Sequence, residues 1–304
     1  MSKTVLITGA TGQQGGSVID HLLGQDDDLE ILALTRDVTS PGAQRLAAKS
    51  PKIKLVQGNL DQPEDIFVNW QKVTSQSIWG VFSVQVPAFG GSRDIEERQG
   101  KGLVDAALKN HVKLFVHTSV DRGGDASLEN PTNIPHFISK HYIEQHLIDS
   151  SKNTEMAWTI LRPVAFMDNL TPDFVGKVFT TTWKIALKGK PLQLIAVTDI
   201  GFFGAQAFLH PAEYKGKCIS LAGDDLTFDD MAKIFKSKTG KDVPLTFDFV
   251  VRLFMWLVND FGYMFRWFHD EGYKADIAAL RKVHPGLKDL STWLETESVF
   301  IDNK

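Results

Sequence analysis

Short apolar segments alternate with amphipathic ones through the first half of the chain. The apolar segments are rich in Val, Ile, Leu and Phe, and the segments between them repeat apolar residues at the three- and four-residue spacing of a helix face. Strands that alternate with helices in this way predict βαβ units and a parallel sheet covered on both faces. The predicted strands are 4–8, 30–35, 53–57, 79–84, 114–119 and 158–161, and the predicted helices are 17–23, 42–49, 63–74, 95–110 and 136–150.

The alternation stops after Pro163, and residues 247–273 are dense in Phe, Trp and Tyr. We therefore predict an α/β fold with a Rossmann-type, doubly wound parallel sheet in residues 1–163. Residues 164–304 are expected to form a smaller, mainly helical lobe over the carboxyl edge of the sheet, with some segments returning to the sheet. The aromatic residues have two interpretations, a hydrophobic core or an apolar cleft that stacks a flat ligand.

A glycine-rich turn joins the first predicted strand to the first predicted helix. This order of strand, turn and helix directs backbone N–H groups and the positive end of the helix dipole at a pyrophosphate. The pattern predicts a dinucleotide site, against the alternative of a turn that binds nothing, and we expect a positive φ at its middle glycine. The residues of the turn are Gly9, Ala10, Thr11, Gly12, Gln13, Gln14 and Gly15.

The residue after the second predicted strand indicates which dinucleotide is preferred. Arg36 lies 21 positions after Gly15, where an acidic residue favours NAD and an arginine accommodates the extra phosphate of NADP. A guanidinium pairs with phosphate in a bidentate fork and stacks on flat rings. We therefore predict NADP(H) as the cofactor, although the neighbouring Asp37 would repel a phosphate if it pointed inward. In the alternative interpretation Arg36 only ends the strand in solvent.

Composition narrows the class of protein without naming an activity. The net charge of −4 and the scattered basic residues argue against nucleic-acid binding. A single cysteine, Cys218, excludes an intrachain disulfide and suits a reducing compartment. No apolar run approaches the length of about 20 residues that a membrane span needs. We expect no metal site, no membrane contact, and a cytoplasmic protein that could also enter the nucleus.

Motifs spread over nearly the whole chain resemble those of the NmrA-like family, a group of atypical short-chain dehydrogenase/reductases. The intact glycine turn is more similar to the redox-sensor members of the family than to its founding fungal regulator. The motifs that carry the resemblance are the glycine turn, Leu34-Thr35-Arg36, Asn59-Leu60-Asp61, His136-Phe137-x-x-Lys140 and Leu161-Arg162-Pro163.

The resemblance implies cofactor contacts after the third, fourth and sixth strands, toward the adenine, the ribose and the nicotinamide respectively. At the first of these places a different role is open, because Asp61 could instead cap the helix that begins near Pro63. The implied contact residues are Asn59, Leu60, Asp61, Ser83, Val84, Gln85, Pro163, Val164, Ala165 and Phe166.

The catalytic residues of short-chain reductases are only partly present. Those enzymes place a proton-donating Tyr one helical turn before a Lys, whereas here His136 precedes Lys140. Tyr142 lies about 200° around the helix from Lys140 and is no substitute. Either the site is inert, or His136 or Lys140 is the acid, or Lys140 only binds the ribose. Ser119, at the end of the fifth strand, could polarise a substrate carbonyl.

Two classes of function follow. In the first, the protein binds NADP(H) and either reduces a small apolar or aromatic carbonyl, enone or quinone, or senses the NADPH/NADP ratio without turnover. In the second, it is a protein-interaction module, the partner of a transcriptional regulator, whose binding the dinucleotide modulates. The polar segment 121–134 is long enough to form a lid or a disordered loop in either case.

Overall fold

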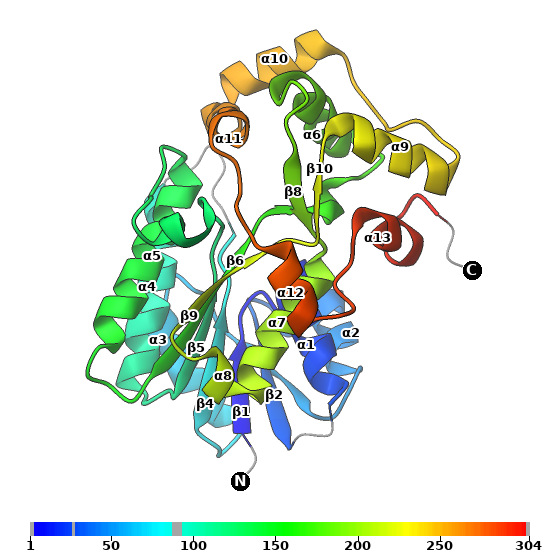
Figure 1. Cartoon of the computed structure of the whole chain (residues 1–304). Helices are drawn as coiled ribbons and strands as arrows, with labels where there is room; N and C mark the ends of the chain where they lie inside the picture. The colour runs from blue at the N-terminus through cyan, green and yellow to red at the C-terminus, as the bar shows by residue number, and fades with distance from the viewer. Residues whose placement is uncertain (1–2, 26–27, 87–92, 302–304) are drawn as a thin grey trace.

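The computed structural model describes residues 3–25, 28–86 and 93–301, and its main feature is a seven-stranded parallel sheet with helices on both faces (Figure 1). Its strands are β1 (Lys3–Ile7), β2 (Leu29–Thr35), β3 (Ile53–Gln57), β4 (Ile78–Ser83), β5 (Leu114–Thr118), β6 (Ala157–Pro163) and β9 (Lys217–Leu221). They follow the order β3-β2-β1-β4-β5-β6-β9. The doubly wound, Rossmann-type sheet predicted from the hydrophobic pattern is confirmed.

The strand order reverses at β1, which pairs in parallel with β2 on one side and with β4 on the other. Doubly wound folds bind ligands in the crevice at the carboxyl ends of such a strand pair. Thr8 holds this junction together, because its Oγ1 accepts a hydrogen bond from the backbone N of Val84 at 2.8 Å and donates one to the Val84 carbonyl at 3.2 Å. The strand-order reversal, where folds of this class bind ligands, therefore lies beside the glycine turn.

Two helix pairs pack closely beside the sheet. In one, α1 (Gln13–Leu23) contacts α7 (Val197–Leu209), and a methyl group on Gly201 would lie only 2.0 Å from Ser17 Oγ. In the other, α4 (Arg93–Lys109) contacts α5 (Pro135–Ser151), and a methyl group on Gly100 would lie 2.4 Å from Ile143 Cδ1. The other helices near the sheet are α2 (Pro41–Ala47), α3 (Pro63–Asn69), η1 (Trp70–Lys72), η2 (Gly124–Leu128) and α8 (Pro211–Tyr214).

After β6 the chain forms a lobe, rejoins the main sheet, and returns to the lobe. The lobe contains a small sheet in which β8 (Leu192–Ile195) pairs in parallel with β7 (Ala165–Phe166) and antiparallel with β10 (Asp224–Leu226). Between β8 and β10 in sequence, the chain forms α7 and α8 and then β9, which joins the main sheet beside β6. The mainly helical region after β6 is confirmed; its remaining helices are η3 (Met167–Asn169), α6 (Phe174–Ala186), α9 (Phe228–Thr239), α10 (Asp248–Leu257), α11 (Asn259–Asp270), α12 (Ile277–Val283) and α13 (Leu290–Thr296).

The aromatic segment divides between the interior and the surface of the lobe. Phe265, Trp267 and Phe268 on α11 are buried in the lobe's hydrophobic core, as the core interpretation predicts. Phe249 and Trp256 on α10 are instead 70% and 74% exposed. Exposed aromatic side chains gathered on one helix are uncommon on a monomer surface and mark a place where an apolar ligand or partner can bind.

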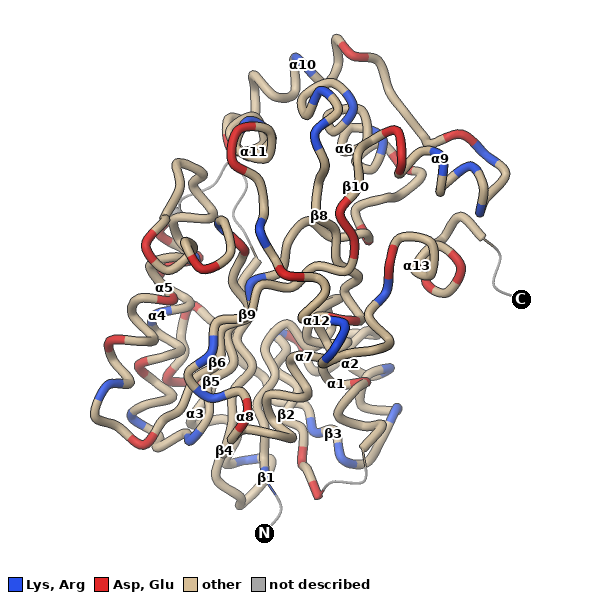
Figure 2. The backbone as a smooth tube through the Cα atoms, viewed as in Figure 1, with Lys and Arg blue, Asp and Glu red and all other residues tan. Residues whose placement is uncertain are grey.

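Charged residues of both signs are interspersed along the chain, including the lobe (Figure 2). This distribution agrees with the scattered basic residues noted in the sequence. Within residues 3–25, 28–86 and 93–301, no helix combines the length and the apolar character needed to cross a lipid bilayer.

Candidate functional site

The glycine turn is compact because its glycines lie against backbone atoms. The Gly12 N–H donates to the Gly9 carbonyl at 2.9 Å, and a Cβ on Gly15 would lie 2.5 Å from the carbonyl oxygens of both Thr8 and Gly9. The positive φ of the turn is +58° at Gly9. The expectation of a positive φ at Gly12 is wrong, since its φ is −95°. The left-handed residue is therefore Gly9, two residues after the end of β1.

The turn leads directly into the N-terminus of α1. Gly12 is the N-cap, and within the described chain no side chain hydrogen-bonds at this cap. Thr11 and Gln13 are exposed, and the Gln14 side chain accepts a hydrogen bond from Thr118 Oγ1 at 2.8 Å, which ties the turn to the end of β5. An uncapped helix N-terminus behind a glycine turn is a ready site for an anion such as a pyrophosphate.

Arg36 is exposed directly after β2, at the same edge of the sheet as the glycine turn. The neighbouring Asp37 accepts hydrogen bonds on Oδ1 from the Thr39 hydroxyl at 2.6 Å and the Thr39 backbone N at 2.8 Å. The Thr39 hydroxyl and backbone N–H together lower the pKa of Asp37. The Asp37 carboxylate is therefore held within its own loop, and Arg36 is the cationic side chain directly after β2 that can meet a phosphate.

The residues after β3 do not have the helix-capping role that the sequence left open for Asp61. Asp61 does not cap α3; the N-cap is Gln62, without a side-chain cap bond. Instead Asp61 Oδ1 accepts from Gln99 Nε2 at 3.0 Å and from Arg98 Nη2 at 3.3 Å, and these two bonds lower its pKa. Asn59 Oδ1 accepts from the Asp61 backbone N at 3.1 Å. With Leu60 half-buried between them, these residues form a fixed rim beside α4.

The predicted contact residues at the end of β4 differ in burial and in what they contact. Ser83 and Gln85 are buried, and Gln85 Nε2 donates to Ser83 Oγ at 2.9 Å. Val84 lies against the glycine turn, since its Cγ1 would be 2.6 Å from a Cβ on Gly9. Val84 is therefore the residue of this group that lies against the glycine turn.

The segment after β6 is held by backbone bonds on both sides. The Asp121 N–H donates to the Pro163 carbonyl at 3.1 Å, and the Val164 N–H donates to the Leu221 carbonyl at 3.1 Å. Val164 and Ala165 are buried, whereas Phe166 is half-buried. This segment connects the main sheet to the lobe and is hydrogen-bonded to the chain after β5 and to the end of β9.

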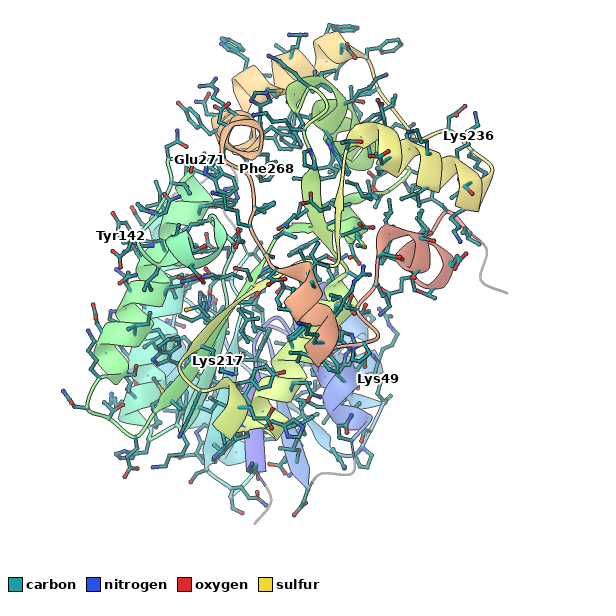
Figure 3. All side chains as sticks on the ribbon, viewed as in Figure 1. Lys49, Tyr142, Lys217, Lys236, Phe268 and Glu271 are labelled. Carbon is teal, nitrogen blue, oxygen red and sulfur yellow. The ribbon has the colours of Figure 1, made fainter. Side chains whose placement is uncertain are left out.

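Lys140 lies in the second turn of α5 and is buried. Its Nζ forms an ion pair with Glu96 Oε1 on α4 at 2.9 Å, and only 9% and 2% of the two side chains are exposed. Tyr142 points away from α5 and is 46% exposed (Figure 3), with Lys101 Nζ 5.5 Å from its ring centre. The structure thus agrees that Tyr142 cannot act beside Lys140, and it adds a carboxylate partner that the sequence motifs did not include.

Two buried histidines lie within the electrostatic field of Lys140. Burial, followed by the positive charge of Lys140, lowers the pKa of His136 to about 3. The same two causes, in the same order, lower the pKa of His117 on β5 to about 3. Both imidazoles are therefore neutral near pH 7, and neither is an imidazolium acid there. We call His117, His136, Lys140 and Glu96 the buried charge cluster.

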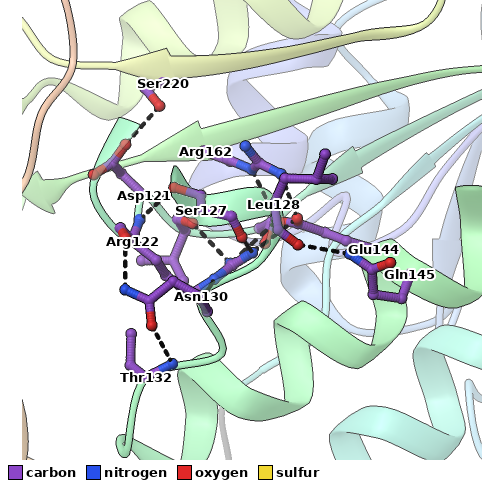
Figure 4. A network of polar contacts seen from close by, with 12 residues as sticks. Asp121, Arg122, Ser127, Leu128, Asn130, Thr132, Glu144, Gln145, Arg162 and Ser220 are labelled. Carbon is purple, nitrogen blue, oxygen red and sulfur yellow. Dashed lines mark hydrogen bonds and ion pairs between the residues drawn. The ribbon is translucent and has the colours of Figure 1, made fainter. Parts of the chain in front are cut away.

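Ser119 belongs to a different network, built around Arg122 (Figure 4). The fully buried Arg122 donates to Ser119 Oγ at 3.3 Å and to Glu144 Oε2 at 2.8 Å. Arg162 donates to the same carboxylate oxygen at 2.7 Å. Burial alone would raise the pKa of Glu144, but the two guanidinium groups hold it below its ordinary value.

The same network corrects the prediction for residues 121–134. Arg122 donates to the carbonyls of Ser127 and Asn130, and the Asp121 carboxylate accepts from the backbone N of Gly123 and Gly124. This segment is therefore a fixed part of the main domain and is neither a lid nor a disordered loop. A long polar loop can be ordered when it contributes its own buried charges to the core.

A cavity of about 1020 Å³ opens beside the start of α5. Pro135, the residue before His136, lies on one wall, and α6, α10 and α11 supply the others. Most of the lining is apolar, and burial raises the pKa of Asp168, one of its few acids. The aromatic residues of the lobe thus line a cleft as well as a core; those in the lining are Phe174, Phe179, Phe254, Phe261 and Tyr263.

The sequence analysis missed Glu96 of the buried charge cluster. The spacing of apolar residues along α4 could have indicated it. The buried positions of α4 include 96, 100, 103, 104 and 107, the spacing of one continuous helix face. Glu96 therefore occupies an apolar-face position, where a carboxylate needs a buried partner. The partner could not be read from α4 alone, because it comes from α5.

The sequence model of the NmrA-like family matches residues 1–294. Among curated relatives, an NmrA-like family domain-containing protein of Dictyostelium discoideum is 26% identical, and the match covers 86% of this chain and 89% of that protein. An NmrA-like family domain-containing oxidoreductase of Penicillium ochrochloron is also 26% identical, over 79% of this chain and 74% of its own length.

Solved structures with the same fold include both a reductase and a regulator. The NADPH-dependent quinone oxidoreductase of Escherichia coli, in complex with NADPH, superposes with a TM-score of 0.71 and 20% identity over 96% of this chain and 98% of its own. NmrA, a negative transcriptional regulator, in complex with NAD, superposes with a TM-score of 0.68 and 17% identity over 97% of this chain and 95% of its own.

Proposed function

The chain belongs to the NmrA-like family, and from that premise we propose that it binds NADP(H) and reduces a small apolar carbonyl, enone or quinone. The observation that carries the proposal is the uncapped N-terminus of α1 behind the Gly9–Gly15 turn, at the strand-order reversal of the sheet. Arg36 at the end of β2 supports NADP(H) over NAD(H).

We assign the cofactor contacts along the carboxyl edge of the sheet. Backbone N–H groups of the glycine turn hold the pyrophosphate, and Arg36 meets the phosphate on the adenine ribose. The rim after β3 borders the adenine, and Val84 borders the central part of the cofactor. Lys140 lies toward the nicotinamide ribose, and the segment after β6 borders the nicotinamide. The assigned residues are Gly9, Ala10, Thr11, Gly12, Gln13, Gln14, Gly15, Arg36, Asn59, Leu60, Asp61, Ser83, Val84, Gln85, Lys140, Pro163, Val164, Ala165 and Phe166.

The residues around α5 set how a proton reaches the substrate. Bound NADPH supplies the hydride. Reduction of a carbonyl then needs one proton on the substrate oxygen, and His136 is neutral at pH 7 because its pKa is about 3. The Lys140 ammonium is consequently the better candidate for the proton donor, because Ser119 is buried and its Oγ accepts a hydrogen bond within the Arg122 network. His136 is left to shape the site.

The cavity beside α5 supports an apolar, flat substrate. Its lining is dominated by aromatic and aliphatic side chains, which favour stacking on a ring system and exclude water from the reacting atoms. The related oxidoreductases named above support a redox function for this chain over a purely structural one.

A titration and a substrate screen test the proposal together. We expect purified protein to bind NADPH more tightly than NADH, and to oxidise NADPH with at least one quinone, aldehyde or enone. NADPH binding with no oxidation by any acceptor would support the redox-sensor version of the same site. Absence of NADPH binding would reject both versions.

A second candidate is the protein-interaction module, and the exposed face of α10 favours it. Phe249, Leu253 and Trp256 follow the spacing of one helix face and are 53–74% exposed, which suits an apolar surface on a partner protein. In this version the dinucleotide modulates partner binding in the cytoplasm or nucleus. A Trp256→Ser variant that keeps NADPH oxidation but loses partner capture would support it, and unchanged capture would reject it.

A further inference from the structure

The Lys140–Glu96 ion pair is buried, and buried ion pairs are costly to break. Nζ and Oε1 are 2.9 Å apart, and the two side chains are 9% and 2% exposed. Removing one partner of such a pair leaves an uncompensated charge in the interior. The pair therefore constrains where the Lys140 ammonium can lie far more strongly than a surface ion pair would.

The close approach of α4 and α5 creates the pair. Gly100 on α4 packs against Ile143 on α5, and a Cβ on Gly100 would overlap that side chain. Glu96 lies one helical turn before Gly100, and Lys140 lies almost one turn before Ile143. Gly100 thus lets α4 lie close against the Ile143 side chain of α5, and the preceding turn of each helix carries the charged residue.

Charges on the neighbouring elements leave Glu96 as the balancing group for Lys140. His117 on β5 and His136 on α5 are neutral, for the reasons given above. Glu144, the other carboxylate near β5, is bound by both Arg122 and Arg162. Among the described residues, Glu96 is the carboxylate that lies within ion-pair distance of the Lys140 ammonium.

We propose that Glu96 is a positioning residue that orients Lys140 toward the nicotinamide ribose; the proposal rests on the proposed function. An ammonium has three N–H donors. The ion pair holds the ammonium beside Glu96, and the N–H groups that point away from Glu96 are available to the ribose hydroxyls and to the substrate oxygen. Glu96 does not touch the cofactor or the substrate.

The test compares two neighbouring glutamates on α4. Glu96→Gln keeps the shape of the side chain but removes its charge, and we expect at least tenfold weaker NADPH binding near pH 7. We also expect its affinity to fall as the pH rises from about 6 to about 9, because a buried ammonium without a counter-charge loses its proton more easily. Glu97→Gln is the matched control, since Glu97 pairs with Lys101 at the surface, and it should bind like the wild type at every pH. Glu96→Asp should restore part of the affinity.

A double variant keeps the test decisive if Glu96→Gln does not fold. Lys140→Met with Glu96→Gln removes both charges, so no charge is left unpaired. If Glu96 acts through Lys140, this double variant binds NADPH as Lys140→Met alone does. A further tenfold loss in the double variant, or a Glu96→Gln variant with wild-type affinity and pH profile, overturns the inference while the proposed function stands. Wild-type protein that fails to bind NADPH overturns both.

Discussion

The two ends of the candidate cofactor site differ in the groups that form them: one is made of backbone groups, and the other of buried ionisable side chains. At one end, the glycine turn offers backbone N–H groups and a helix N-terminus, and its geometry depends on side chains that are absent. At the other end, the buried charge cluster brings side chains from β5, α4 and α5 to one place, and its geometry depends on which charges balance. The glycine turn is therefore sensitive to substitutions that add side-chain atoms, whereas the buried charge cluster is sensitive to the protonation of its side chains.

The difference shows how one sheet edge can separate binding from chemistry. Backbone groups cannot titrate and keep their geometry over a wide pH range, which suits a permanent hold on a phosphate. Buried ionisable groups respond to a proton or a nearby charge, which suits a reacting or sensing end. Variants that act on volume and variants that act on charge should therefore affect the two ends separately.

The largest effect is expected when a glycine of the turn is replaced by a residue with a side chain. In Gly15→Val, the new Cβ would lie 2.5 Å from two backbone carbonyl oxygens, and neither can move without distorting β1. We expect a loss of about 4 kcal/mol or more in the free energy of unfolding, measured by urea denaturation. Gly12→Val should instead fold, because its φ is ordinary, and lose most NADPH binding in calorimetry.

Gly42→Val is the control for these two variants, because a Cβ there meets no atom within 4 Å. It should change neither the stability by more than about 1 kcal/mol nor the affinity. A Gly12→Val protein with wild-type NADPH affinity would show that the phosphate site lies elsewhere.

The second effect belongs to the buried charge cluster and is driven by pH. His136 and His117 have pKa values of about 3 in the fold, against about 6.5 in the unfolded chain. The unfolded state therefore binds more protons below pH 6.5, and stability falls as the pH drops from that value toward 3. The loss is up to about 1.4 kcal/mol per pH unit for each histidine. Urea denaturation of wild type and His136→Phe checks this, and equal slopes for the two proteins would contradict it.

A third, intermediate effect concerns cofactor choice. Arg36→Ala removes the charged side chain after β2, while Asp37 stays bound to Thr39. We expect NADPH binding to weaken by about ten- to a hundredfold, the value of one charged hydrogen-bonded contact, and NADH binding to change little. Calorimetric titration with both dinucleotides measures the ratio. Equal weakening of the two would assign Arg36 a structural role instead.

The smallest effect is expected at the exposed rim after β3. Asp61→Asn loses a charged contact with Arg98, whose side chain is 63% exposed, and keeps an oxygen that can accept from Gln99. Exposed pairs contribute little, so the melting temperature should shift by no more than about 2 °C. A larger shift would mean that the rim supports the fold and is more than a border for the adenine.

The fold and the glycine turn were predictable because their signals are local. Alternating apolar segments and a strand–turn–helix order are complete within a few tens of residues, and six of the seven strands of the main sheet follow from them. The pairing of Lys140 with Glu96 is not local, since it depends on how closely α4 and α5 approach. Likewise, the polar segment after Ser119 has the composition of a lid, and only the position of Glu144 and Arg162 turns Arg122 into a core residue.

The seventh strand of the main sheet has a consequence for the order in which the chain folds. β9 pairs in parallel with β6, although residues 164–216, which include β7, α6 and β8 of the lobe, lie between them. Contacts that are so distant in sequence form slowly, because a long loop must close before the pairing stabilises it. On the ribosome, β6 remains an unpaired edge until β9 emerges, and nascent chains ending before Lys217 are exposed to aggregation through that edge. Pulse-labelled hydrogen exchange during refolding should therefore show β2 and β3, whose residues Ile31 and Ile53 pair only 22 positions apart, protected before β9.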